Sequence, residues 1–237
     1  MSAAEWTAIR LSLWVATVAV VFSLPLGICC GWVLARKKFP GKFLLETLVN
    51  LPLVLPPVVT GYLLLVAFGR KGFLGSWLEG WLGLRIVFDW KGAALAAAVV
   101  SFPLMVRAIR TAFVSVDPEL EGAARTLGAS RWSTFRSVSL PLARHGVIAG
   151  CLLAFARSLG EFGATIMIAG NIMGETQTIP LFIYEQMQVP DGINNSIAIL
   201  LFSVLMAALA LIVGGWLENR SRYHLAGDHL NESGTVG

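Results

Sequence analysis

Long uncharged segments constrain this chain more than any other feature of its sequence. The first of them separates Arg10 from Arg36, and residues 11–35 contain no charged side chain. About 20 apolar residues suffice for an α-helix to cross the hydrocarbon core of a bilayer. A soluble domain carries charge on roughly a quarter of its residues, whereas here the charged fraction is 14% and the hydrophobic fraction is 56%. The sequence therefore predicts an all-α, polytopic membrane protein.

Five predominantly apolar segments are predicted to span the membrane. They cover residues 11–35, 47–69, 92–110, 142–170 and 196–217. Basic side chains are concentrated directly after the first segment, between Arg36 and Lys42, and basic residues accumulate in cytoplasmic loops. This places the N-terminus outside and, after five crossings, the C-terminus inside. We expect one membrane domain over residues 1–226 and a disordered cytoplasmic tail over residues 227–237.

The second segment contains three prolines, Pro52, Pro56 and Pro57. Proline removes a backbone donor and disrupts a helix, and unsatisfied carbonyl groups are costly where they face lipid. We therefore expect a broken helix that is buried against other helices or along a water-lined path. A kink that serves packing alone explains the prolines equally well.

The fourth segment carries two charges at membrane depth, Arg157 and Glu161. Their spacing of four residues allows the side chains to pair along a helix. Charges inside a bilayer are expensive and usually face the protein interior or a water-filled cavity. Two hypotheses are equally supported at this stage, a role in a permeation pathway and an ion pair that only stabilises the fold.

A polar stretch, residues 117–141, interrupts the apolar pattern. Asp117 can cap a helix and is followed by a proline, which suits the first helical position. Gly128 is suited to end that helix, and Ser130 can cap a second short helix that ends before Pro141. A loop between membrane spans needs no structure of its own. Two helices in this loop therefore indicate a docking device on the cytoplasmic side.

Several kinds of chemistry are absent from the sequence. There is no P-loop pattern, so ATP is not bound in the usual way. The histidines are scattered and the cysteines lie in apolar segments, so neither a metal site nor a catalytic centre is predicted, and no basic patch suits nucleic acid. An ion-coupled carrier would need more ionisable residues at depth or inverted repeats. The chain is therefore expected to be no enzyme and to receive energy from a partner.

The polar stretch resembles the EAA motif of the permease subunits of ATP-binding cassette (ABC) importers. That motif reads Glu-Ala-Ala-x-x-x-Gly with a later Leu-Pro. The matching residues here are Ala123, Ala124, Gly128, Leu140 and Pro141. The position of the motif's glutamate is Gly122, and a glutamate stands one place earlier, at Glu121. The departure leaves open which carboxylate, if any, does the work of the motif's glutamate.

Within that family the chain is similar to the permeases of molybdate importers. The similar stretches include SFPLMVRAIR, EGAARTLGASRW and LAFARSLGEFGATI, and together the matches cover most of residues 20–185. Sulfate and thiosulfate permeases carry a related FARSLGEFGA segment and are the alternative. An ion-coupled secondary carrier is less favoured.

The resemblance implies a type I importer in the bacterial inner membrane. Two copies of the permease would form the pore as a homodimer. Two ATPase subunits would hold and hydrolyse ATP-Mg, so this chain would bind no cofactor, and a periplasmic protein would deliver molybdate or tungstate. The small alanines would let the first helix of the loop enter an ATPase groove, with Glu121 and Arg125 as a polar edge. The coupling loop would comprise Glu119, Glu121, Ala123, Ala124, Arg125, Gly128, Leu140 and Pro141.

Overall fold

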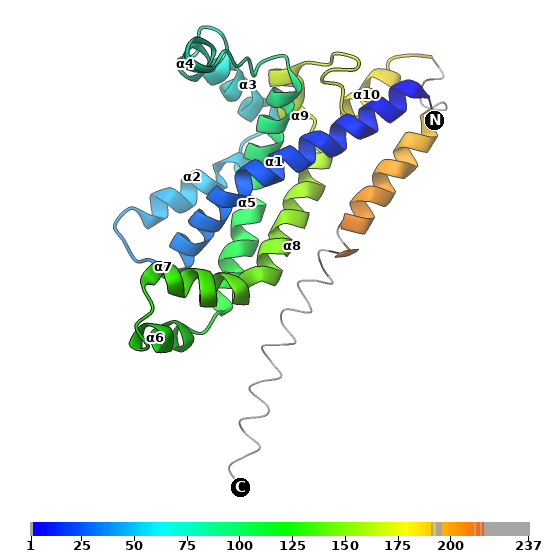
Figure 1. Cartoon of the computed structure of the whole chain (residues 1–237). Helices are drawn as coiled ribbons and strands as arrows, with labels where there is room; N and C mark the ends of the chain where they lie inside the picture. Colours follow the sequence, from blue (N-terminus) through cyan, green and yellow to red (C-terminus); the bar gives the residue numbers. More distant parts are fainter. Residues whose placement is uncertain (1, 191, 193–195, 211, 214, 216–237) are drawn as a thin grey trace.

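Helices form all the regular structure in the described residues of this computed structural model, which are 2–190, 192, 196–210, 212–213 and 215. In chain order the elements are α1 (Ala3–Arg36), α2 (Lys42–Val54), α3 (Pro57–Phe68), α4 (Phe73–Leu82), α5 (Trp90–Ser115), α6 (Pro118–Thr126), α7 (Arg131–Thr134), the π-helix η1 (Phe135–Ser139), α8 (Leu140–Leu159), α9 (Gly163–Ala169) and α10 (Ile179–Gln186) (Figure 1). A shorter apolar helix, Ile197–Ala210, follows them. The all-α prediction is confirmed for this part of the chain.

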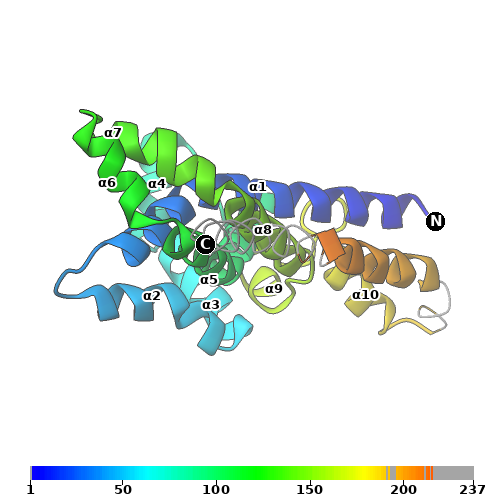
Figure 2. The same cartoon turned by 90° about the horizontal axis from the view of Figure 1, so that it is seen from below.

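The core is built from α1, α5 and α8, which pack side by side (Figures 1 and 2). Glycine permits the close approach of these helices. A Cβ added to Gly31 would lie 2.6 Å from the Ile109 side chain, and one added to Gly146 would lie 2.2 Å from Cβ of Ala112. Both distances are too short for a real contact. Glycine at these two positions is therefore what brings α1 and α8 against α5.

Three helical segments are each long and apolar enough to cross a membrane, namely α1, α5 and the continuous run Arg131–Leu159. The pair α2 and α3 passes the same test only together, because the two helices meet at a bend of 113°. The described residues thus provide three spans, or four if the bent pair is one. The fifth predicted span, 196–217, and the predicted tail, 227–237, reach outside the described residues, so the count of five remains a prediction.

The predicted second span is broken, as its prolines indicated. Pro52 lies inside α2, Pro56 is the residue before α3, and Pro57 is the first residue of α3. In the single chain the expected burial is seen for one face of α3, at Thr60 and Gly61, which packs against α9, and not for most of α2. Val49 is the one buried residue of α2, and the remainder of that helix is exposed or half-buried.

The predicted fourth span, 142–170, differs from the structure at both ends. α7, η1 and α8 form one continuous helix, so the prediction that the helix ends before Pro141 is wrong. Proline cannot donate to the carbonyl one turn back, and its ring collides with that turn. The π-helical turn η1 immediately before Pro141, closed by Leu140 N–H to Phe135 O, widens the helix and accommodates the ring. At the other end, α8 stops at Leu159, and the helix is interrupted before α9 begins at Gly163.

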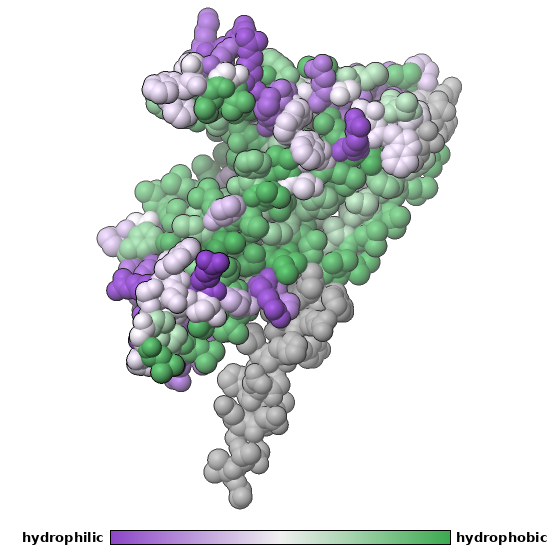
Figure 3. All heavy atoms as spheres, in the orientation of Figure 1, coloured by the Kyte–Doolittle hydropathy of each residue, from purple (hydrophilic) through white to green (hydrophobic). Residues whose placement is uncertain are grey.

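The surface is divided into polar ends and an apolar middle. On the face in Figure 3, hydrophilic residues gather at two ends and hydrophobic residues cover the region between them. α6 and α7 lie at one end, whereas α4 and the beginning of α1 lie at the other (Figure 1). This separation is what a membrane-embedded chain requires, and the loop of α6 and the start of α1 lie at opposite ends of the molecule.

Candidate functional site

The first candidate site is the polar stretch predicted from the sequence, and its first helix begins and ends as the residues indicated. The Asp117 carboxylate accepts a hydrogen bond from Glu119 N–H, at 2.8 Å, and caps α6. At the other end, Gly128 adopts φ +90°, a conformation that favours glycine. The N–H groups of Gly128 and Ala129 bond to the carbonyls of Arg125 and Ala124. These two bonds form a Schellman motif, which ends the helix.

The outer surface of this stretch carries apolar side chains although it lies at a polar end of the molecule. Leu120 and Trp132 are exposed, and Leu127 is 88% exposed. Ala123 and Arg125 are exposed beside them. Exposed apolar side chains at a polar end of the molecule are suited to contact with a partner. Among the other predicted residues, Glu119 is exposed in the first turn of α6, Ala124 is half-buried, Leu140 packs half-buried against the core, and Pro141 is exposed on α8.

Glu121 points away from the exposed surface of α6. Its side chain is 10% exposed, and Oε1 lies 3.2 Å from Arg36 Nη2. The Ser139 hydroxyl donates to the same oxygen at 2.8 Å. The expectation that Glu121 and Arg125 form one outward polar edge is therefore wrong. The motif position itself, Gly122, is exposed and a Cβ there would meet nothing within 4 Å.

The second candidate site lies where the two broken helices meet. A Cβ added to Gly163 would lie 2.9 Å from Cβ of Pro57, and one added to Gly61 would lie 2.6 Å from Ala164 O. The first turns of α3 and α9 are thus in near-backbone contact. The sequence indicated the proline break but not the break at residues 160–162. It also gave no sign that the two breaks lie next to each other in the fold.

Arg157 and Glu161 lie beside this junction and form the predicted ion pair. Arg157 Nη2 lies 2.8 Å from Glu161 Oε2. The guanidinium is not aligned for a hydrogen bond with that oxygen, so the contact is electrostatic. The other oxygen accepts the Ala164 N–H at 2.8 Å and caps the start of α9. Glu161 lies in the break rather than inside a helix, with 2% of its side chain exposed, whereas Arg157 is 31% exposed.

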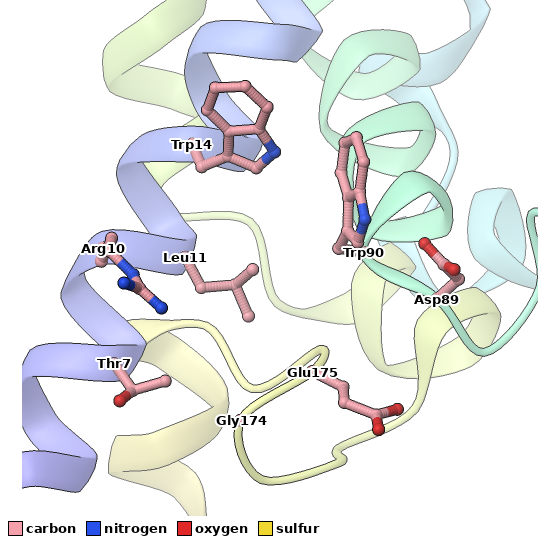
Figure 4. A pocket seen from close by; sticks show the side chains of 8 residues that line it. All are labelled: Thr7, Arg10, Leu11, Trp14, Asp89, Trp90, Gly174 and Glu175. Atoms are coloured by element: carbon pink, nitrogen blue, oxygen red, sulfur yellow. The ribbon is translucent and has the colours of Figure 1, made fainter.

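A cavity of about 590 Å³ lies at the end of the molecule opposite α6. Figure 4 shows Arg10 and Trp14 on α1, Trp90 at the start of α5, and Glu175 on a loop. The two indole rings lie 5.9 Å apart. Because the cavity holds charges of both signs, it does not favour an anion over a cation. Sequence reasoning missed this site, since its residues are far apart along the chain.

Comparison with known proteins identifies the class. Residues 23–223 match the family described as the binding-protein-dependent transport system inner membrane component. The chain therefore belongs to this family of membrane permeases, as the EAA resemblance predicted. The fold is shared with a crystallised bacterial ABC transporter involved in the import of the acidic polysaccharide alginate. The TM-score is 0.64 at 18% identity, covering 94% of this chain and 80% of that one.

Sequence identities to individual permeases show which members of the family the chain is most similar to among those compared. The chain is 55% identical over 218 residues to the molybdenum transport system permease protein ModB of Escherichia coli (strain K12), covering 92% of this chain and 95% of that protein. It is 40% identical over 216 residues to the sulfate transport system permease protein CysT of the same organism, covering 91% of this chain and 76% of that protein. The predicted order of resemblance, molybdate before sulfate, is confirmed.

Proposed function

We propose that the chain is the permease subunit of an ATP-driven importer in the bacterial inner membrane, with molybdate as its cargo. One observation carries the proposal, which is the 55% identity to a molybdenum permease over 95% of that protein's length. Tungstate has the shape and charge of molybdate and would share the pathway. Sulfate is the second candidate, supported by 40% identity to a sulfate permease.

The energy would come from an ATPase that binds the exposed surface of α6. The sequence contains no P-loop, and Leu120, Leu127 and Trp132 give this polar end an apolar patch that a partner can cover. A homodimer would supply two such surfaces and take two ATPase subunits. A periplasmic binding protein would deliver the anion at the opposite end. The mostly exposed α2 is apolar enough to face either lipid or the second copy.

The anion would pass the junction of the broken helices along the interface between the two permeases. Arg157 supports this route because its guanidinium has five N–H donors and is 31% exposed, so Glu161 leaves donors free. Glu161 is held on both oxygens and would keep Arg157 in place. An arginine at this depth is costly unless it faces water or protein, which favours a pathway over a lipid-facing position.

Uptake of radiolabelled molybdate tests the proposal. The chain would be expressed with its ATPase and binding protein in cells that lack their own molybdate uptake. We expect saturable uptake that tungstate inhibits, that excess sulfate barely affects, and that an inactive ATPase abolishes. Preferential uptake of sulfate would support the second candidate. Transport by this chain alone in liposomes, driven by an ion gradient, would refute the importer.

A further inference from the structure

The carboxylate of Glu121 links α6 to the end of α1 and to the residue before α8, and Arg36 extends this link to the end of α5. Arg36, the last residue of α1, places Nη2 3.2 Å from Glu121 Oε1. The same nitrogen donates to the carbonyl of Val116, the residue after α5, at 2.6 Å. Ser139, the last residue before α8, donates its hydroxyl to Glu121 at 2.8 Å. One buried cluster of four residues thus ties together α1, α5, α6 and the start of α8.

The burial of this cluster shows that its contacts are closed to water. The side chains of Arg36 and Glu121 are 14% and 10% exposed, and Val116 and Ser139 are buried. Charges removed from water are strongly destabilising unless they are paired. Arg36 is also placed favourably, because cations are stabilised at the C-terminal end of a helix.

Aromatic packing also holds the helix ends around this cluster together. The ring of Phe135 in η1 lies 5.6 Å from Trp32 of α1 and 6.1 Å from Phe113 of α5. The ends of α1, α5 and η1 are therefore fixed to each other without α6. The backbone on both sides of α6 is short and includes a left-handed glycine, Gly128. α6 also contacts α7 and η1, and Glu121 adds a buried charged link from α6 to α1.

We propose that Glu121 is a positioning residue that makes α6 rigid with α1 and α8, so that a displacement of α6 by the ATPase reaches the membrane spans directly. It does not replace the motif's glutamate at the ATPase surface, because that position is Gly122, which is exposed. The inference rests on the proposed function, since it needs a partner that moves α6.

The test measures anion transported per ATP hydrolysed by the complete importer in proteoliposomes. Glu121→Gln keeps the size of the side chain and an acceptor for Ser139, but it removes the ion pair with Arg36. We expect the complex to assemble and hydrolyse ATP, while the transport ratio falls at least about tenfold. The matched control Glu79→Gln breaks the exposed ion pair with Arg85 and should leave the ratio unchanged. An unchanged ratio in Glu121→Gln would overturn the inference.

A second variant separates the two possible roles of the carboxylate. Adding Gly122→Glu to Glu121→Gln restores an acid at the motif position without restoring the internal link. We expect no recovery of the transport ratio. Recovery would show that Glu121 acts at the ATPase surface and would overturn the inference.

A milder change covers the case in which Glu121→Gln fails to fold. Ser139→Ala keeps the ion pair and removes only the link to the start of α8, and it should still lower the ratio measurably. A ratio equal to that of the wild type would overturn the inference. If the wild-type importer moves sulfate rather than molybdate, the proposed cargo fails while the same ratio, measured with sulfate, decides the role of Glu121.

Discussion

Glu161 provides a quantitative test of the junction between the broken helices. One oxygen lies 2.8 Å from the Arg157 guanidinium, and the other accepts the Ala164 N–H that begins α9. Glu161→Ala removes both contacts. Glu161→Gln removes the charge alone, because the carboxamide oxygen can still accept the backbone N–H.

The two contacts predict different losses of stability. Removing one partner of a buried ion pair costs about 3–5 kcal/mol. Since Arg157 is 31% exposed, water relieves part of that cost, and we expect Glu161→Gln to lower the free energy of unfolding by about 2 kcal/mol. Loss of a helix cap adds about 1 kcal/mol. Glu161→Ala should therefore cost about 3 kcal/mol.

Unfolding of the purified permease in detergent, followed by tryptophan fluorescence, measures both losses. Combining Glu161→Gln with Arg157→Gln completes a double-mutant cycle, and the double variant should lose less than the sum of the single losses by at least about 1 kcal/mol. Strictly additive losses would refute the ion pair. Equal losses for Glu161→Ala and Glu161→Gln would refute the cap. Glu79→Gln, in an exposed ion pair, should change stability by less than about 1 kcal/mol.

Three further substitutions test other parts of the structure. Gly128→Val forces a β-branched residue to φ +90°, which should cost about 1–3 kcal/mol and reduce co-purification of the ATPase. Nothing lies within 4 Å of its Cβ position, so backbone strain is the only effect that we expect. A wild-type yield of complex would refute this expectation. Leu127→Glu should leave the unfolding temperature of the permease unchanged and abolish ATPase binding, measured by the same co-purification. Gly146→Leu places a side chain into Ala112 of α5, and we expect loss of folded protein in membranes, whereas Gly80→Leu, with no neighbour within 4 Å, should express normally.

Features encoded within a few residues were predicted from the sequence. The cap at Asp117, the end of α6 at Gly128 and the break near Pro56 all follow from local chemistry. Each of these residues acts on backbone groups in its own turn. Neighbouring sequence therefore contains the whole cause, and the structure agrees with the prediction.

Features that depend on distant partners could not be predicted. Glu121 turns inward because Arg36 and Ser139 meet it from other helices, and an isolated helix gives no sign of this. Pro141 usually indicates a helix end, yet a π-helical turn carries the helix past it. Whether a chain breaks or widens at a proline depends on the packing on either side of it.

α8 connects the two candidate sites. Ser139, which binds Glu121, directly precedes it, and Arg157 lies two residues before its end. A helix of 20 residues is about 30 Å long, and both of its glycines, Gly146 and Gly150, lie in close contact with α5. A push on α6 that is transmitted through Glu121 would therefore reach Arg157 at the other end of α8, and Glu161 and α9 connect Arg157 to α3. The separate positions of the two sites are thus consistent with one mechanism, in which the polar contact at each end of α8 is as necessary as the helix between them.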